Sequence, residues 1–175
     1  MVSKLPCYHW ASYSTVNLNV IPYHLLRVLR LLSQTSHIAH LSSRADNDMY
    51  DHMNNSIYNF LYDSVINTYL IENCGLHPPT SPQYGMVVHS HNDYFSSISF
   101  PAVAELALRV NRIGNSSVTY EIALFEKGQE AVKSVGEFVQ VFVDRETGRP
   151  NSKGMNPELR RGLERILVKS PDSKL

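Results

Sequence analysis

Residues 56–73 read Ser-Ile-Tyr-Asn-Phe-Leu-Tyr-Asp-Ser-Val-Ile-Asn-Thr-Tyr-Leu-Ile-Glu-Asn and contain neither glycine nor proline. Polar residues recur at intervals of three and four and form one narrow stripe: Ser56, Asn59, Asp63 and Asn67. The remaining positions are largely apolar or aromatic, so the segment predicts a helix that is buried on most of its sides. Gly75 and the pair Pro78-Pro79 predict its end, because glycine suits the position after a helix and proline prevents continuation.

The chain after this helix alternates between apolar and polar residues, as is typical of β-strands. The strand-like segments are 84–100, 105–113, 118–124 and 131–143, with turn sequences such as Gly114-Asn115 between them. Asn156-Pro157-Glu158 then predicts a short helix to about Val168. One long buried helix followed by antiparallel strands indicates an α+β domain. We expect a hotdog fold, in which a curved antiparallel sheet is wrapped around one long central helix.

The composition limits the class of protein. The chain has 175 residues, of which 43% are hydrophobic and 18% charged, enough for one domain with a real core and against global disorder. Sixteen basic and sixteen acidic residues cancel, so we expect no nucleic-acid partner. No apolar stretch is long enough for an integral membrane segment. The two cysteines, Cys7 and Cys74, form neither a disulfide framework nor a zinc set, which favours a reducing compartment.

The N-terminal segment differs from the rest. Residues 1–45 contain four basic residues and no Asp or Glu, a pattern that mitochondrial targeting segments share. We therefore divide the chain into an N-terminal extension (1–43), which is either a targeting segment or poorly ordered, a domain (44–169) and a tail (170–175). The expected location is cytoplasmic, with mitochondrial as the alternative. Residues 37–43 alternate only weakly, so a first strand there would be distorted.

A dense group of polar residues leads into the long helix. It comprises Asp46, Asp48, Asp51, His52, Asn54 and Asn55. The first backbone N–H groups of a helix have no partner within it and carry a partial positive charge, so they stabilise a developing oxyanion. A carboxylate beside them can act as a general base or nucleophile on a carbonyl group. Helix capping explains one of Asp51, Asn54 and Asn55, but not the whole group.

The pattern Asp46-x-Asp48-x-x-x-His52-x-Asn54-Asn55-x-x-Tyr58 resembles the helix-leading motif of the 4-hydroxybenzoyl-CoA thioesterase-like acyl-CoA thioesterases, a hotdog family. The similarity extends over roughly 44–168. It includes Phe100-Pro101 and the segments 112–117 and 143–150. One departure is Arg44, which stands where the family usually has an aromatic residue before the motif.

The resemblance implies hydrolysis of an acyl-CoA to a free acid and CoA, with no cofactor other than the coenzyme A of the substrate. It implies that Asp48 is the catalytic carboxylate and that the helix start at Asn55 polarises the thioester carbonyl. His52 is either an orienting residue or a structural hydrogen-bonding residue. The resemblance also implies a homodimer or homotetramer with its sites at the interface.

Residues outside this motif are candidates for binding the substrate or for an alternative catalytic role. Tyr58 is expected to contact substrate, and Arg112, Ser116 and Ser117, with Arg109, could meet the phosphates of coenzyme A because guanidinium and N–H groups suit phosphate. A solvated strand edge would explain the same residues. Asp63 is the alternative catalytic carboxylate or a dimer contact.

Three further interpretations stay open at this level. His89, His91 and Asp93 would share one face of a strand, but a metal site needs further ligands and a closed geometry, so no metal is expected. Rival functions are an enoyl-CoA hydratase or dehydratase on the same fold and a module that binds acyl-CoA without turnover. Cys74 is expected to be a small buried residue.

Overall fold

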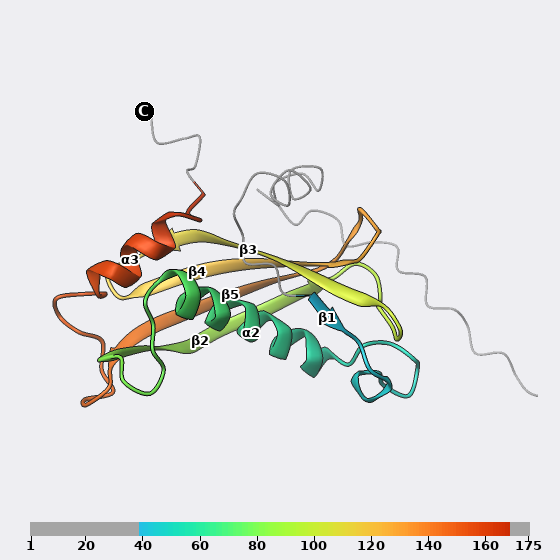
Figure 1. Cartoon of the computed structure of the whole chain (residues 1–175), viewed down its shortest axis with the longest axis horizontal. Helices are drawn as coiled ribbons and strands as arrows, with labels where there is room; N and C mark the ends of the chain where they lie inside the picture. Colours follow the sequence, from blue (N-terminus) through green and yellow to red (C-terminus); the bar gives the residue numbers. More distant parts are fainter. Residues whose placement is uncertain (1–38, 169–175) are drawn as a thin grey trace, which may run out of the picture.

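The computed structural model describes residues 39–168. Its elements are β1 (Ala39–Leu41), the 3-10 helix η1 (Arg44–Asp46), α2 (Asn55–Asn73), β2 (Gln83–Tyr94), β3 (Val103–Ile113), β4 (Ser117–Glu126), β5 (Val132–Asp144) and α3 (Pro157–Glu164). The strands form one antiparallel sheet in the order β1-β3-β4-β5-β2. Figure 1 shows α2 lying along one face of this curved sheet, with α3 at the far end from β1. The expected α+β hotdog architecture is confirmed.

Local sequence signals determine both ends of α2. The Asn54 side chain accepts a hydrogen bond from the N–H of Ser56, which makes Asn54 the N-cap. At the other end Gly75 has a φ of 67°, the left-handed conformation that glycine adopts easily after a helix. The helix predicted from residues 56–73 is therefore confirmed, with Asn55 added at its start.

The main core lies between α2 and one face of the sheet. On the strand side it contains alternate residues of the segments 105–113 and 118–124, as their alternating pattern predicts: Leu106, Leu108, Val110, Val118, Tyr120, Ile122 and Leu124. A smaller cluster on the other face of the sheet contains Ala107, Ala123, Phe125 and Val132. Successive strand residues point to opposite faces, so this division follows from the period of two.

The helix is less enclosed than its sequence predicts. Phe60 and Ile71 of α2 are 63% and 43% exposed, whereas Tyr62, Val65 and Ile66 are fully buried. The sheet covers one side of α2, and these two apolar side chains lie on the side that the described part of the protomer leaves open.

Two predicted boundaries are wrong, each because of a distant contact. The strand predicted over 84–100 ends at Tyr94: the N–H groups of Phe95 and Ser96 both bond to the Lys133 carbonyl of β5. The chain then turns toward the helix start, where the Ile98 carbonyl accepts a hydrogen bond from the N–H of Met53. The helix predicted to reach about Val168 ends at Glu164, because the next residues bond to Val110 of β3 through the carbonyl of Ile166 and the N–H of Val168.

The first strand is short. β1 pairs with the start of β3 through three residue pairs, from Ala39 with Glu105 to Leu41 with Val103. It lies within the segment that the sequence separates as an extension, and Ser42 continues the contact by donating to the Ala102 carbonyl. Residues 1–38 of the predicted N-terminal extension (1–43) and the whole predicted tail (170–175) lie outside the described residues. Within residues 39–168, no helix combines the length and apolar character needed to cross a membrane.

Candidate active site at the start of the long helix

A closed loop carries the polar motif to the start of α2. The carbonyl of Asp46 accepts a hydrogen bond from the N–H of Asn54 at 2.8 Å, and Asn47 and Met53 form an isolated antiparallel bridge. Met53 also donates to the carbonyl of Ile98, at 2.8 Å. These bonds hold both ends of the loop against the helix start and the segment before β3.

Asp48 is anchored inside this loop by one of its two carboxylate oxygens. Its Oδ1 accepts hydrogen bonds from the N–H groups of Tyr50 (2.8 Å) and His52 (3.1 Å). The Asp48 side chain is partly exposed. Within the described chain its Oδ2 forms no hydrogen bond, so one oxygen of an oriented carboxylate remains for a substrate or a water molecule.

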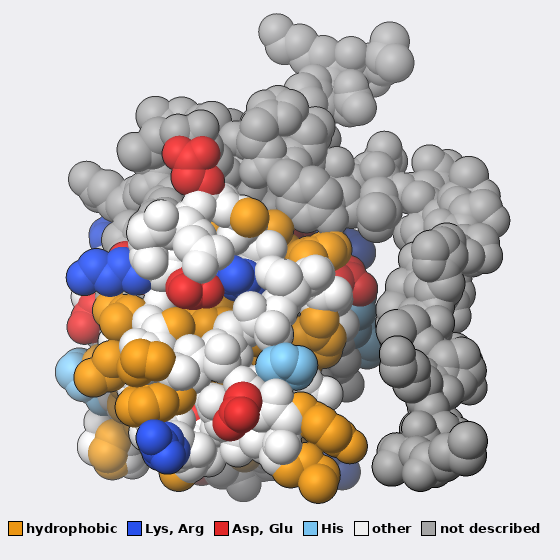
Figure 2. Space-filling model, turned by 90° about the vertical axis from the view of Figure 1, so that its right-hand side faces the viewer, with side chains coloured by type: hydrophobic (Ala, Val, Ile, Leu, Met, Phe, Trp, Pro, Cys, Tyr) orange, Lys and Arg blue, Asp and Glu red, His pale blue; other side chains and the backbone are white. Residues whose placement is uncertain are grey.

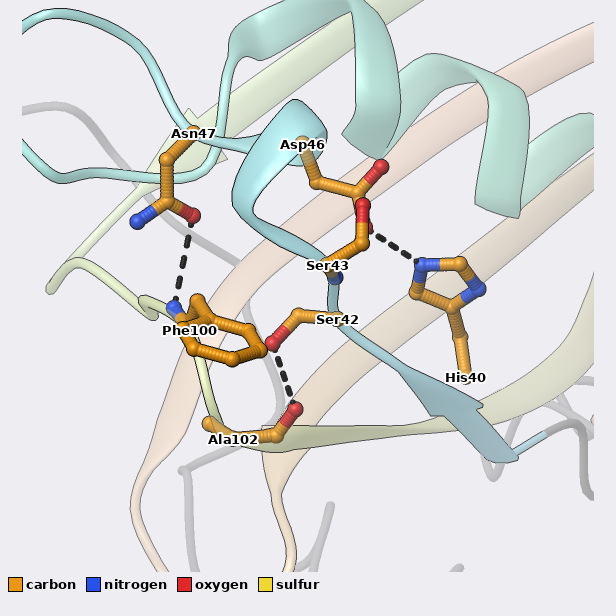
Figure 3. A network of polar contacts seen from close by, with 7 residues as sticks. All are labelled: His40, Ser42, Ser43, Asp46, Asn47, Phe100 and Ala102. Atoms are coloured by element: carbon orange, nitrogen blue, oxygen red, sulfur yellow. Dashed lines mark hydrogen bonds and ion pairs between the residues drawn. The ribbon is translucent and has the colours of Figure 1, made fainter.

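Asp46, the first acid of the motif, has a structural role. Its Oδ2 accepts hydrogen bonds from the Ser43 N–H (2.7 Å) and from Nε2 of His40 (2.9 Å), an arrangement visible in Figure 3. The Ser43 backbone and, next, the His40 side chain lower the pKa of Asp46 below its usual value. Figure 3 also shows Asn47 accepting from the N–H of Phe100, which ties the loop to the approach to β3.

The first turn of α2 has one N–H group left for a ligand. The N–H of Ser56 bonds to the Asn54 side chain, and that of Ile57 bonds to the Asn54 carbonyl. Asn55 occupies the first helical position, whose N–H has no acceptor within the helix. The Asn55 side chain is exposed, and the backbone carbonyl of Asn55 accepts a hydrogen bond from the Asn59 side-chain amide. The backbone of Asn55 is therefore the available donor at this end.

His52 and Tyr58 lie near the same helix start in different environments. His52 is exposed, and its backbone, rather than its imidazole, contacts Asp48. Tyr58 is 3% exposed and packs edge-to-face on Tyr62 and Tyr94, with ring centroids 6.5 and 5.1 Å apart. Burial raises the pKa of the Tyr58 phenol.

The residues predicted to hold coenzyme A lie at the opposite end of the sheet. Arg112 is exposed near the end of β3, Ser116 lies in the turn that follows, and Ser117 is the first residue of β4. The eleven residues of β3 separate this turn from the Asp48 loop by roughly 35 Å, at about 3.3 Å per residue. One protomer does not bring the two groups together. Arg109 is 8% exposed and forms an ion pair with Glu121 at 2.5 Å.

Sequence reasoning missed one residue, Asn92, that extends the helix start onto β2. Asn92 donates to Oδ1 of Asn59 at 3.0 Å and lies 3.3 Å from the Tyr94 hydroxyl. The signal that could have found Asn92 is an amide in the middle of a strand, where asparagine is uncommon. Asp63 lies further along the same helix face, and its carboxylate accepts from Asn67 at 2.9 Å. Partial burial raises the pKa of Asp63, although this hydrogen bond opposes the shift.

The surface around the site is partly apolar. Figure 2 shows the end of the molecule at which α2 begins, where patches of hydrophobic side chains alternate with single charged ones. Exposed apolar residues in the segments that meet here are Leu41 (68%), Met49 (86%), Tyr50 (72%) and Phe100 (40%). Such a surface suits an apolar ligand or a protein partner.

Comparison with known proteins agrees with this fold. The model of the thioesterase-like superfamily matches residues 44–163, and the chain belongs to that family. The crystal structure of the PA5185 protein from Pseudomonas aeruginosa strain PAO1 is 41% identical, covers 77% of this chain and 93% of its own, and superposes with a TM-score of 0.73. No match was found among curated proteins.

More distant structures share the fold. A predicted thioesterase from Bacillus stearothermophilus is 18% identical, with a TM-score of 0.65 and coverage of 77% of this chain and 97% of its own. The SAV2348 protein from Staphylococcus aureus, solved in complex with CoA, is 14% identical, with a TM-score of 0.69 and coverage of 80% and 91%.

Proposed function

We propose that this protein is an acyl-CoA thioesterase that hydrolyses an acyl-CoA to a free carboxylic acid and CoA. The observation that carries the proposal is the pairing of two features in one short segment. Asp48 has one carboxylate oxygen anchored by backbone N–H groups and one left over, and Asn55 supplies an N–H at the positive end of α2. Family membership supports the thioester as the substrate bond.

The proposed reaction uses these two groups on one carbonyl. The thioester oxygen accepts a hydrogen bond from the Asn55 N–H, which stabilises the negative charge of the tetrahedral intermediate. Asp48 takes a proton from water, and the resulting hydroxide adds to the carbonyl carbon. The C–S bond then breaks, the acid is released, and the thiolate takes up the proton. Direct attack by Asp48, through a mixed anhydride that water then hydrolyses, uses the same free oxygen.

The family and the apolar surface beside the loop support an acyl thioester as the proposed substrate class. Met49, Tyr50 and Phe100 are exposed next to the helix start and would contact an acyl group. The Staphylococcus aureus relative was solved with CoA, which favours CoA as the carrier of that group.

We place the complete site at an interface between two copies. Within one protomer Arg112, Ser116 and Ser117 are too far from Asp48 to bind the same substrate molecule, so a second copy would have to supply them. The long edge strand β2 and the exposed Phe60 of α2 offer unpartnered surface in the described part of the protomer.

The test of the catalytic role is Asp48→Asn, with Asp51→Asn as the matched control. Asparagine at 48 keeps an oxygen for the Tyr50 and His52 N–H groups but loses basicity. Asp51 has a φ of 61°, which asparagine tolerates, so its variant changes an exposed carboxylate in the same loop without straining it. Thiol release from acyl-CoA should fall by at least about 100-fold in Asp48→Asn and stay near wild type in Asp51→Asn. Full turnover by a folded Asp48→Asn protein would refute the assignment.

Two measurements separate the rival functions. An acyl-CoA-binding module would bind substrate without releasing thiol, and a hydratase would hydrate an enoyl-CoA faster than it hydrolyses a saturated acyl-CoA.

Mixing inactive Asp48→Asn with inactive Arg112→Ala tests the shared site. If each site takes Asp48 from one copy and Arg112 from the other, a mixed dimer contains one site in which both residues are intact. Recovery of part of the activity supports an interface site, and no recovery in a confirmed mixed dimer contradicts it.

A further inference from the structure

A second cluster of chemically capable side chains lies on β2 and β5, apart from the helix start. The ligand atoms of His89, His91 and Glu137 all lie within 4.8 Å of one another. His91 pairs directly with Glu137 across the two strands, and His89 pairs with Val139. Residues two apart on a strand share a face, so both imidazoles and the carboxylate stand together.

This cluster faces away from α2. Asn92, the neighbour of His91, bonds to Asn59 of the helix, and a Cβ at Gly136, the neighbour of Glu137, would contact the Tyr62 ring. His91 and Glu137 therefore lie on the outer face of the sheet, because adjacent strand residues point to opposite sides. Both histidines are exposed and Glu137 is half-buried, so the cluster is open to solvent.

Two imidazoles and one carboxylate are a common ligand set for a divalent transition metal ion. Zinc binds imidazole nitrogen at about 2.0–2.1 Å, so two ligand atoms of one ion lie roughly 3–4 Å apart. Ligand atoms that lie within 4.8 Å of one another reach that spacing when the exposed imidazoles move by about 1–2 Å. Asp93, on the same face, lies 3.4 Å from Nε2 of His91 and can complete or orient the set.

We propose that His89, His91 and Glu137 form a binding site for a divalent transition metal ion, of which zinc is the probe of choice. The sequence alone argues against a metal here, because His89, His91 and Asp93 lack a further ligand. The fold supplies that ligand from β5. The site is distinct from the proposed thioesterase centre, since it lies on the opposite face of the sheet from α2.

The test uses the full chain after treatment with a chelator. Zinc binding is measured by titration calorimetry, and cobalt binding by the visible absorption of cobalt bound to nitrogen and oxygen ligands. Wild type should bind one equivalent that is lost or weakened by at least about 100-fold in His91→Ala and in Glu137→Gln. His77→Ala, which removes an exposed imidazole from a loop, is the matched control and should bind as wild type does.

These measurements distinguish zinc binding at this site from zinc binding at the other six histidines of the chain. They also distinguish it from the proposed thioesterase activity. Equal zinc affinity in wild type and in folded His91→Ala and Glu137→Gln proteins would overturn the site. Wild-type protein that binds no zinc at concentrations on the order of 100 micromolar, at which weak open sites are occupied, would overturn it as well. Thiol release by chelated protein should persist, so loss of the metal site and failure of the thioesterase proposal give different results.

Discussion

Asp48 and His52 are joined twice through the backbone of the loop before α2. The Asp48 N–H donates to the His52 carbonyl at 2.7 Å, and the His52 N–H donates to Oδ1 of Asp48 at 3.1 Å. The orienting contact that the sequence led us to consider for His52 is therefore made by its peptide groups. An imidazole is not required for it.

This relationship predicts a mild effect for His52→Ala. Alanine keeps both peptide groups, so the Asp48 carboxylate should stay oriented and kcat/KM for acyl-CoA should fall by less than about tenfold, or roughly 1.4 kcal/mol of transition-state stabilisation. Steady-state thiol release checks this. A loss comparable to that of Asp48→Asn would mean that the imidazole itself takes part in the reaction.

Replacing Asn54 should weaken the start of α2. Its side chain accepts from the Ser56 N–H at 3.0 Å, and an N-cap asparagine replaced by alanine costs about 1 kcal/mol. Denaturant unfolding should show this loss for Asn54→Ala. Asn54→Asp keeps an acceptor at the positive helix end and should remain within a few tenths of a kcal/mol of wild type. Equal losses in both variants would argue against the cap.

The Asp46 cluster should make stability depend on pH in the acid range. The fold lowers the pKa of this carboxyl, so the ionised form is favoured in the folded state. Its stabilisation is complete above the unfolded pKa of about 4 and is lost as pH falls through the folded value. The difference in unfolding free energy between wild type and Asp46→Asn should therefore shrink as pH drops below about 4.

His40→Ala serves as the partial control for this pH effect. It removes one of the two groups that lower the Asp46 pKa and leaves the Ser43 N–H in place. Urea unfolding at several pH values should give His40→Ala a smaller acid dependence than wild type and a larger one than Asp46→Asn. A constant difference between wild type and Asp46→Asn across this range would contradict the role of Asp46.

Gly136→Ala should destabilise the core by about 1–3 kcal/mol because the site is already filled. An added Cβ would lie 2.6 Å from the Tyr62 ring and 2.8 Å from Oδ1 of Asn92. Tyr62 is fully buried, packs on Phe138 and hydrogen-bonds to Ser134, so the ring cannot move without cost. Thermal or urea unfolding measures the loss.

Gly128→Ala gives a useful comparison for this prediction. Gly128 has a φ of 84° and no atom within 4 Å of an added Cβ, so alanine there strains only the backbone. The expected loss is about 1 kcal/mol. If Gly136→Ala lowers the free energy of unfolding by no more than Gly128→Ala does, the space between β5 and the Tyr62 ring accommodates a methyl group, which contradicts this prediction.

The sequence by itself determined the features that depend on neighbouring residues. The apolar pattern of 56–73 predicts α2, Gly75 marks its end, and Asn156-Pro157 starts α3, because periodicity and capping act within a few residues. The sequence left the N-cap of α2 open among Asp51, Asn54 and Asn55, and the structure selects Asn54. The inward residues of β3 and β4 follow from alternation in the same way. The motif at 46–58 also located the candidate site.

Only the tertiary structure decided what depends on distant segments. It ends β2 at Tyr94 and α3 at Glu164, joins Asn92 to Asn59, brings Glu137 beside His89 and His91, and separates Arg112 from Asp48 by the length of β3. Each of these results depends on contacts between segments far apart in the sequence, and the position of Glu137 beside His89 and His91 depends on the register of β2 and β5. Register is a property of two segments at once, so the pattern of either segment alone does not determine it.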